Sequence, residues 1–353
     1  MSTAIVECIS SLSVIAQQLR RLPWILESGF PKMPSTVMES DVPRIFREPY
    51  IQTGYRPINQ NWKYYFLSLF QKHNESVNVW THLLVALAVL LRFRAFAESE
   101  TFSWETMSFP LVIYVLSSLT YLTCSMLAHL LQSKSELAHY SFYFMDYVGV
   151  CTYQYGSALA HYYYSSNQGW YDVAWPFYLP GAAFLGWMSC IGCCYAKYRY
   201  RRPYPVMRKL CQVVPAGLAY ILDISPVIHR ILNCHLDSCT DMSFWFHCLQ
   251  IIFFIIGAYF FSCPVPEKYF PGCCDIVGHG HQIFHVFLGL CTLSQLEGVL
   301  LDYNNRQEHF RVRYSSGYTQ MSCISFFLLI LSSAVSAIYL QQKIKKQLAE
   351  KDF

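Results

Sequence analysis

The chain is poor in charged side chains. Asp, Glu, Lys and Arg make up only 14% of its 353 residues, against about 25% in a typical soluble domain. Hydrophobic residues make up 54% of the chain and aromatic residues 17%. This balance predicts a protein that lies mainly in lipid rather than in water.

The sequence also lacks the features of two other protein classes. Its net charge is only +4, and no basic run accompanies a recognisable nucleic-acid-binding module, so we expect no nucleic-acid partner. We expect no cleavable signal peptide either, because Glu7 interrupts the apolar run of residues 1–18 and Arg20 and Arg21 follow that run instead of preceding it. The N-terminal region is therefore expected to stay in the cytoplasm.

Cysteine is plentiful, with fifteen residues, but the positions imply no disulfide framework. Many of the cysteines lie inside apolar segments, where cysteine behaves as a small hydrophobe. Cys234 and Cys239 share one short loop. They are either a disulfide, if that loop is extracellular, or two free thiols.

Eight apolar stretches predict an all-α membrane protein with eight transmembrane helices, since a spanning helix needs about 20 mostly apolar residues. The stretches are residues 77–96, 109–131, 140–164, 174–196, 210–232, 244–262, 280–301 and 321–340. The first, third, fifth and seventh carry polar residues, which makes them the less apolar half of the set.

Basic residues in the loops predict the orientation, because Lys and Arg are retained on the cytoplasmic side. Residues 197–209 contain six of them and residues 1–74 contain eight. Three other loops contain none: residues 97–108, 165–173 and 233–243. An even number of spans then places both termini in the cytoplasm, although residues 302–320, expected outside, break the pattern with three arginines.

These predictions divide the chain into a cytoplasmic region (1–74), a transmembrane domain (75–340) and a cytoplasmic tail (341–353). Within the first region, an apolar helical face predicts an interfacial helix near residues 61–72. A loop with chance aromatics is the alternative. The face consists of Trp62, Tyr65, Phe66, Leu69 and Phe70.

Several polar residues fall inside the predicted spans, where an ionisable group costs about 2.5–3.5 kcal/mol on insertion. They are Ser125 and His129 at the end of the second span, Asp146 near the start of the third, and His281 and His285 at the start of the seventh. A spacing of four places both members of a pair on one helix face. Because alternate spans run in opposite directions, all five residues are expected near the cytoplasmic ends of their helices.

Three imidazoles are the ligand set of a catalytic-type zinc site, which keeps a fourth position open. We therefore predict that His129, His281 and His285 bind Zn²⁺. Asp146 could either bind the metal or act as a base, and Ser125 could hydrogen-bond water or a backbone carbonyl. The alternative is a network of hydrogen bonds between His and Asp that ties three helices together without a metal.

A third polar set lies at the start of the first span, at positions i, i+3 and i+7 of one helix face. It consists of Glu75, Asn78 and His82. We expect these residues to support the site or the helix start and not to bind the metal.

The spacing of these residues resembles the signature motifs of the progestin and adipoQ receptor family, over about residues 45 to 340. The motifs are Glu75-x-x-Asn78-x-x-x-His82, Ser125-x-x-x-His129 followed by Asp146, and His281-x-x-x-His285, with residues 266–272 leading to the last of them. The resemblance implies a helical bundle like those of the adiponectin receptors and ceramidases, with zinc at the three histidines. It also implies a plasma-membrane progestin receptor that signals rapidly, without a nuclear step, through an inhibitory G protein and lowered cyclic AMP. As an alternative it implies a zinc-dependent lipid amidase, in which Asp146 and Ser125 would be catalytic.

A steroid receptor needs an apolar cavity with a few polar groups for the steroid's keto oxygens. Gln212, near the start of the fifth span, is the candidate hydrogen-bond donor, and an interfacial glutamine bonded to backbone or water is the alternative. Asp223 in the same span predicts a kink or a polar pocket. The basic residues of 197–209 could bind membrane lipid or a G protein, but an orientation signal is enough to explain them.

Overall fold

The computed structural model describes residues 33–99, 102–202, 204–233 and 241–350. Helices are the regular secondary structure of these residues, joined by turns and loops, and one isolated β-bridge links Val37 and Tyr55. The predicted all-α fold is therefore confirmed for the described part of the chain. The predictions made for residues 1–18 and for the loop of Cys234 and Cys239 lie outside the described residues.

Seven of the described helices are long and apolar enough to cross a membrane. They are α3 (Ser76–Ala97), α4 (Phe109–Leu131), α6 (Gln168–Arg199), α7 (Val206–Leu232), α8 (Met242–Ser262), α9 (Gly280–Asn305) and α11 (Ser316–Ala349). Each of them contains most of one predicted span. Short 3-10 turns extend α4 to Thr106–Lys134, and α6 and α11 run beyond the predicted ends, with 32 and 34 residues.

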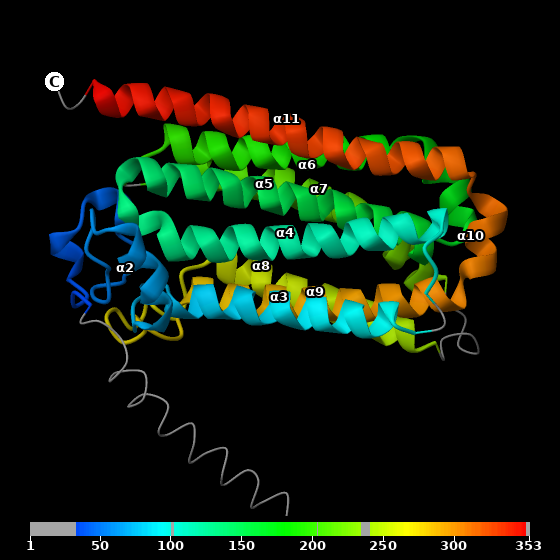
Figure 1. Cartoon of the computed structure of the whole chain (residues 1–353), viewed down its shortest axis with the longest axis horizontal. Coiled ribbons are helices and arrows are strands. Elements are labelled where there is room, and N and C mark those ends of the chain that lie inside the picture. Colours follow the sequence, from blue (N-terminus) through cyan, green and yellow to red (C-terminus); the bar gives the residue numbers. More distant parts are fainter. Residues whose placement is uncertain (1–32, 100–101, 203, 234–240, 351–353) are drawn as a thin grey trace, which may run out of the picture. The chain divides into compact units, whose positions relative to one another are not determined.

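The third predicted span corresponds to α5 (Glu136–Ala160), which continues into the π-helical turn η6 (His161–Ser165). With 25 residues, α5 is about 37 Å long and could cross the apolar core of a bilayer. It is not among the seven apolar helices, so the predicted count of eight spans is not confirmed. Figure 1 shows α5 running alongside α4, and it packs against α4, α6 and α11.

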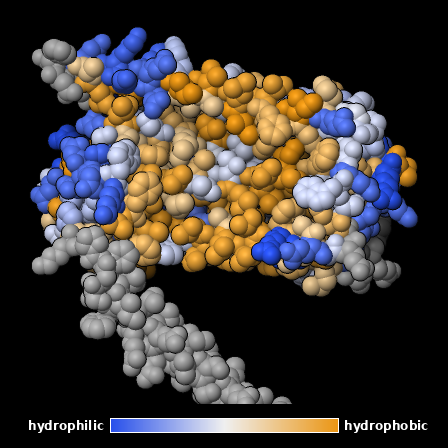
Figure 2. All heavy atoms as spheres, viewed as in Figure 1, coloured by the Kyte–Doolittle hydropathy of each residue, from blue (hydrophilic) through white to orange (hydrophobic). Residues whose placement is uncertain are grey.

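Large apolar side chains are exposed along the middle of the helices. Figure 2 shows them as an apolar band between two polar ends. Examples are Leu84, Leu87 and Leu91 on α3, Ile252 and Ile255 on α8, and Phe327, Leu328 and Leu331 on α11. A continuous apolar surface of this kind would be unfavourable in water and is suited to lipid tails. Together with the seven apolar helices, it identifies a multi-pass membrane protein.

A short helix, α2 (Trp62–Leu67), is present where the interfacial helix is predicted. The Asn61 side chain caps it by accepting a hydrogen bond of 2.8 Å from the backbone N–H of Tyr64. Trp62 and Phe66 are about half exposed, whereas Tyr65 is fully buried. The exposed aromatics suit a membrane interface, and the location of α2 there stays a prediction.

Candidate metal centre

Three histidines from two helices meet at the end of the bundle where α4 finishes and α9 begins, which we call the metal end (Figure 1). The ligand atoms of His129, His281 and His285 all lie within 4.8 Å of one another. The Nε2 atoms of His129 and His281 are 3.4 Å apart. Two nitrogens on a tetrahedral zinc would lie about 3.3 Å apart, since each bond is about 2.0–2.1 Å. The histidines therefore fit the predicted ion.

The loop before α9 holds the start of the helix that carries two of these histidines. Glu267 accepts a hydrogen bond of 2.7 Å from the backbone N–H of Gly280, the first residue of α9. A Cβ atom at Gly280 would lie 2.8 Å from the carbonyl oxygen of Val265, so this close approach requires glycine. Gln282 fixes the loop further, because its side-chain amide donates a hydrogen bond of 2.9 Å to the carbonyl oxygen of Ile276.

Oxygen acceptors hold the outer nitrogens of two of the histidines. Nδ1 of His129 donates a hydrogen bond of 2.6 Å to the Glu75 carboxylate. The same carboxylate oxygen accepts a hydrogen bond of 2.7 Å from the Asn78 side chain. The backbone oxygen of Asn78 lies 3.3 Å from Nδ1 of His285. An imidazole that donates from Nδ1 keeps the lone pair of Nε2 for a metal, and this is the usual arrangement around metal-binding histidines. The structure thus brings Glu75 and Asn78 to the histidines that they are predicted to support.

His82 contacts the centre through its ring face. It is stacked on His285, with ring centroids 3.9 Å apart and an angle of 6° between the planes. It is 1% exposed, and neither of its ring nitrogens has a hydrogen-bond partner among the described residues. It does not belong to the group of three ligand atoms, so its placement suits support and not ligation.

Asp146 and Ser125 lie beside the histidines without joining them. Asp146 is 9% exposed, and its Oδ1 atom has no hydrogen-bond partner among the described residues. Ser125 is a neighbour of that carboxylate. Asp146 is outside the group of atoms that lie within 4.8 Å of one another, and its two predicted roles, binding the metal or acting as a base, stay predictions.

Arg56, which the sequence analysis counted only as part of the basic N-terminal region, is buried against the end of α4. It is 2% exposed. Its guanidinium donates hydrogen bonds to the carbonyl oxygens of His129 (2.6 Å) and Leu130, and a third to the hydroxyl of Ser68 (2.9 Å). The last carbonyls of a helix lack partners within the helix and attract a cation. Burial lowers the pKa of Arg56 below its usual value, and the charge of Glu75 opposes that shift. Arg56 therefore fixes the turn of α4 that carries His129.

His73 fixes the other side of the same region. Burial, reinforced by the charge of Arg56, holds the pKa of His73 well below 6.5, so the ring is neutral. Its Nε2 lies 3.1 Å from the carbonyl oxygen of Ser68, and its Nδ1 accepts a hydrogen bond of 3.1 Å from the backbone N–H of Glu75. The residue that orients His129 is thus itself held in place.

The residues considered for a steroid site differ in their surroundings. Gln212 lies in the second turn of α7 and is 7% exposed, and its side chain forms no hydrogen bond with another described residue. Its amide is available to a ligand, and its role stays a prediction. At Asp223, where a kink or a polar pocket is predicted, the carboxylate accepts a hydrogen bond from Ser157 (2.7 Å) and lies 2.9 Å from Nδ1 of His161. The protein's own side chains therefore satisfy Asp223.

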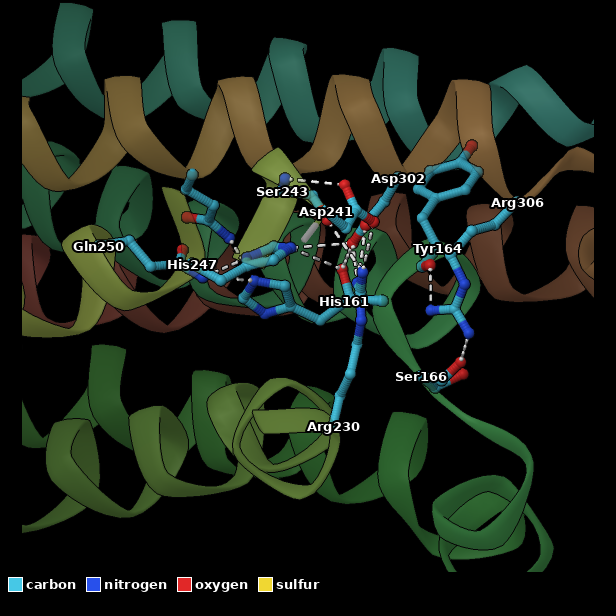
Figure 3. A network of polar contacts seen from close by, with 12 residues as sticks. His161, Tyr164, Ser166, Arg230, Asp241, Ser243, His247, Gln250, Asp302 and Arg306 are labelled. Atoms are coloured by element: carbon cyan, nitrogen blue, oxygen red, sulfur yellow. Dashed lines mark hydrogen bonds and ion pairs between the residues drawn. The ribbon is translucent and has the colours of Figure 1, made fainter. Parts of the chain in front are cut away.

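A second buried polar network lies at the opposite, far end of the bundle (Figure 3). Asp302 of α9 is fully buried and accepts two hydrogen bonds from Arg230 of α7, at 2.7 and 2.8 Å. Its Oδ2 atom also accepts from Ser165 of η6 (2.6 Å) and lies 2.8 Å from Nε2 of His247 of α8. One carboxylate therefore joins four elements. Sequence patterns did not suggest this network, because its residues are far apart in the chain.

Comparison with known proteins adds a family and several relatives. The model of the family described as "Haemolysin-III related" matches residues 70–296. The chain is 69% identical to the membrane progestin receptor beta of Homo sapiens and 67% identical to that of Sus scrofa, over the full length of each. It is 52% identical to the membrane progestin receptor alpha-B of Danio rerio, over 99% of both chains.

Proposed function

The chain belongs to the haemolysin-III-related family of progestin and adipoQ receptors, and we propose that it is a membrane progestin receptor. The observation that carries this proposal is the identity of 66–69% to three mammalian membrane progestin receptors beta across the whole chain. Its ligand would be a progestin, and Gln212 is the proposed donor to a keto oxygen. We further propose that it signals from the plasma membrane through an inhibitory G protein and lowered cyclic AMP.

The proposed topology has eight spans, with α5 as the third span and both termini in the cytoplasm. Its support is that α5 is long enough to cross and packs against three apolar helices. The arginines that break the charge rule at the far end have structural partners. Arg306 donates to the carbonyls of Tyr164 (2.9 Å) and Ser166 (2.8 Å), and Arg313 donates to the Ser166 hydroxyl (3.0 Å). In this topology the metal end faces the cytoplasm.

The proposed cofactor is Zn²⁺, held by His129, His281 and His285. When bound, zinc supplies a Lewis acid and a strong link between helices. The chain's own contribution is orientation: Glu75 holds the His129 ring, and the Asn78 backbone holds the His285 ring. In a receptor this centre would fix α3, α4 and α9 relative to one another at the metal end.

Binding of tritiated progesterone to purified protein in nanodiscs tests the proposal. We expect saturable binding, with displacement by unlabelled progesterone and not by a steroid of another class. Zinc content is measured on the same samples for wild type, His281→Ala/His285→Ala, and His309→Ala, an exposed histidine on α10 (Gln307–Arg313) that serves as the control. Wild type and control should each hold about one zinc per chain. Absence of saturable steroid binding in a folded, zinc-loaded sample would refute the receptor proposal.

A lipid amidase is the second candidate, because one observation favours it. The buried Oδ1 atom of Asp146 has no partner among the described residues, although it lies beside the three histidines. An unsatisfied carboxylate oxygen is costly to bury, and here it could hold and deprotonate an attacking water. Ceramide hydrolysis by wild type that is lost in Asp146→Asn would favour the amidase. Hydrolysis that survives this change would exclude Asp146 as the base.

A further inference from the structure

A pocket of about 290 Å³ opens at the metal end, separate from the histidines. Three segments line it: the 3-10 turn η2 (Arg44–Phe46), the first turns of α5, and the end of α6 with the residues that follow. The lining contains four cationic side chains and one carboxylate. The residues are Arg44, Lys197, Arg201 and Arg202, with Glu136 as the acidic member and Tyr140 beside it.

Most of this positive charge is not neutralised by the protein. Arg202 forms an ion pair with Glu48, at a long distance of 3.5 Å. No ion pair joins Arg44, Lys197 or Arg201 to a carboxylate of the described residues. The buried Nε atom of Arg202 also lacks a hydrogen-bond partner among them. The pocket therefore offers several unused donors to an anion.

Lys197 makes the strongest argument for an anion. It is only 9% exposed, and it belongs to the last turn of α6, a helix apolar enough to span the membrane. Its ammonium lies 3.8 Å from the centre of the Tyr143 ring, which is a weaker partner than a carboxylate. Burying a charge without an opposite charge costs several kcal/mol, so a bound anion would remove a penalty that the fold alone leaves in place.

We propose that this pocket binds the phosphorylated inositol headgroup of an anionic membrane lipid. Arginine and lysine donors suit phosphate oxygens, and the Tyr140 phenol suits a ring hydroxyl. A lipid is favoured over a free inositol phosphate because Lys197 lies at the end of a spanning helix, where headgroups meet the protein. Basic pockets between helices at the cytoplasmic face are typical sites for such headgroups. This inference goes beyond the proposed steroid function and does not depend on it.

The test uses the full chain in nanodiscs of phosphatidylcholine, with or without a few per cent of phosphatidylinositol 4,5-bisphosphate. Lipid binding is measured by native mass spectrometry and by titration with a fluorescent form of the same lipid. The pocket variant is Arg44→Gln/Lys197→Gln/Arg201→Gln. The matched control, Lys343→Gln/Lys345→Gln/Lys346→Gln, removes the same charge from exposed positions on α11. If the pocket variant does not fold, Arg44→Gln/Arg201→Gln changes only its two exposed members.

We expect the pocket variant to bind the inositol lipid at least about tenfold more weakly than wild type, because it loses charged donors that would contact the phosphates directly. The control should stay within about threefold. Competition by soluble inositol trisphosphate would support recognition of the headgroup. Equal weakening in both triple variants, or no weakening in either, would overturn the proposal. If the protein bound soluble inositol trisphosphate but bound the inositol lipid no better than phosphatidylcholine, the assignment to a lipid would be overturned.

Discussion

Replacing Glu75 with Gln measures how far the proposed zinc ligands depend on their supporting carboxylate. One oxygen of Glu75 accepts hydrogen bonds from Nδ1 of His129 at 2.6 Å and from the Asn78 amide at 2.7 Å. Glutamine has nearly the same size, so the packing of this residue, which is 4% exposed, is preserved. The substitution removes the charge, and a single amide oxygen must replace a charged acceptor for both donors.

The expected effect is a loss of zinc affinity of about 10–100-fold, the usual result of changing the partner of a metal-binding histidine. This corresponds to about 1.4–2.8 kcal/mol, since each factor of ten is about 1.4 kcal/mol. The carboxylate both orients the imidazole and makes Nε2 a stronger ligand. Because the three histidines remain in place, we expect weaker binding and not a complete loss.

Competition against a zinc-binding dye measures this affinity on detergent-purified protein. The matched control is Glu297→Gln, which removes a carboxylate from α9 that pairs with Arg92 at 2.5 and 2.8 Å. Glu297 lies in the fifth turn of α9, about 18 Å along the helix from His285, and Arg92 lies on α3, so zinc affinity should be unchanged. Wild-type affinity in Glu75→Gln, or an equal loss in both variants, would refute the role assigned to Glu75.

Four further outcomes are expected. Arg56→Met should lower the free energy of unfolding by about 2–4 kcal/mol, because buried carbonyls at the end of α4 lose charged donors. Thermal unfolding measures this change, and Arg47→Met, which loses hydrogen bonds to the carbonyls of Val42 (2.9 Å) and Ser40 (3.4 Å) at a more exposed site, should cost less. Asp302→Asn should cost about 2–4 kcal/mol, because this fully buried side chain loses its charge-assisted contacts with Arg230 and His247, and Asp241→Asn, whose partly exposed side chain pairs with Arg230 at 3.0 Å, should cost less. Gln212→Ala should weaken progesterone binding about fivefold to tenfold in a radioligand assay, the value of one hydrogen bond, with no change in thermal stability. Removal of zinc by a chelator should lower the melting temperature, because a ligand at 100 times its Kd contributes about 2.7 kcal/mol; an unchanged melting temperature would exclude a stabilising metal.

Apolar runs predicted the helices well where the helices face lipid. The seven apolar helices coincide with seven of the predicted spans because an exposed residue such as Leu91 or Leu328 must be apolar to contact lipid tails. The helix α5 was harder to judge, since it packs against α4, α6 and α11. Its buried face can carry a polar residue such as Asp146 because protein and not lipid surrounds it.

Helical spacing also predicted which histidines would meet. His281 and His285 share a face of α9 because they are four apart, and the alternating direction of spans brought His129 to the same end. No periodic pattern could reveal Arg56, whose partner His129 lies 73 positions further along the chain. The same is true of Arg230 and Asp302, which are 72 positions apart and meet only through tertiary packing.

The two buried polar centres share one helix, and this has a consequence for how a receptor of this fold can change state. At the metal end, α9 contributes His281 and His285; about 25 Å further along the helix, it contributes Asp302 to the far network. A helix held at both ends cannot shift as a rigid body unless the contacts at one end rearrange. The far network is centred on the fully buried carboxylate of Asp302, and breaking its contacts with Arg230 and His247 leaves that buried charge without them. At the metal end the three proposed zinc ligands are histidines, and neighbouring oxygens orient two of them, so smaller changes there can alter the contacts. We therefore expect movements of α9 to begin at the metal end, where the chain proposed to face the cytoplasm can respond to them.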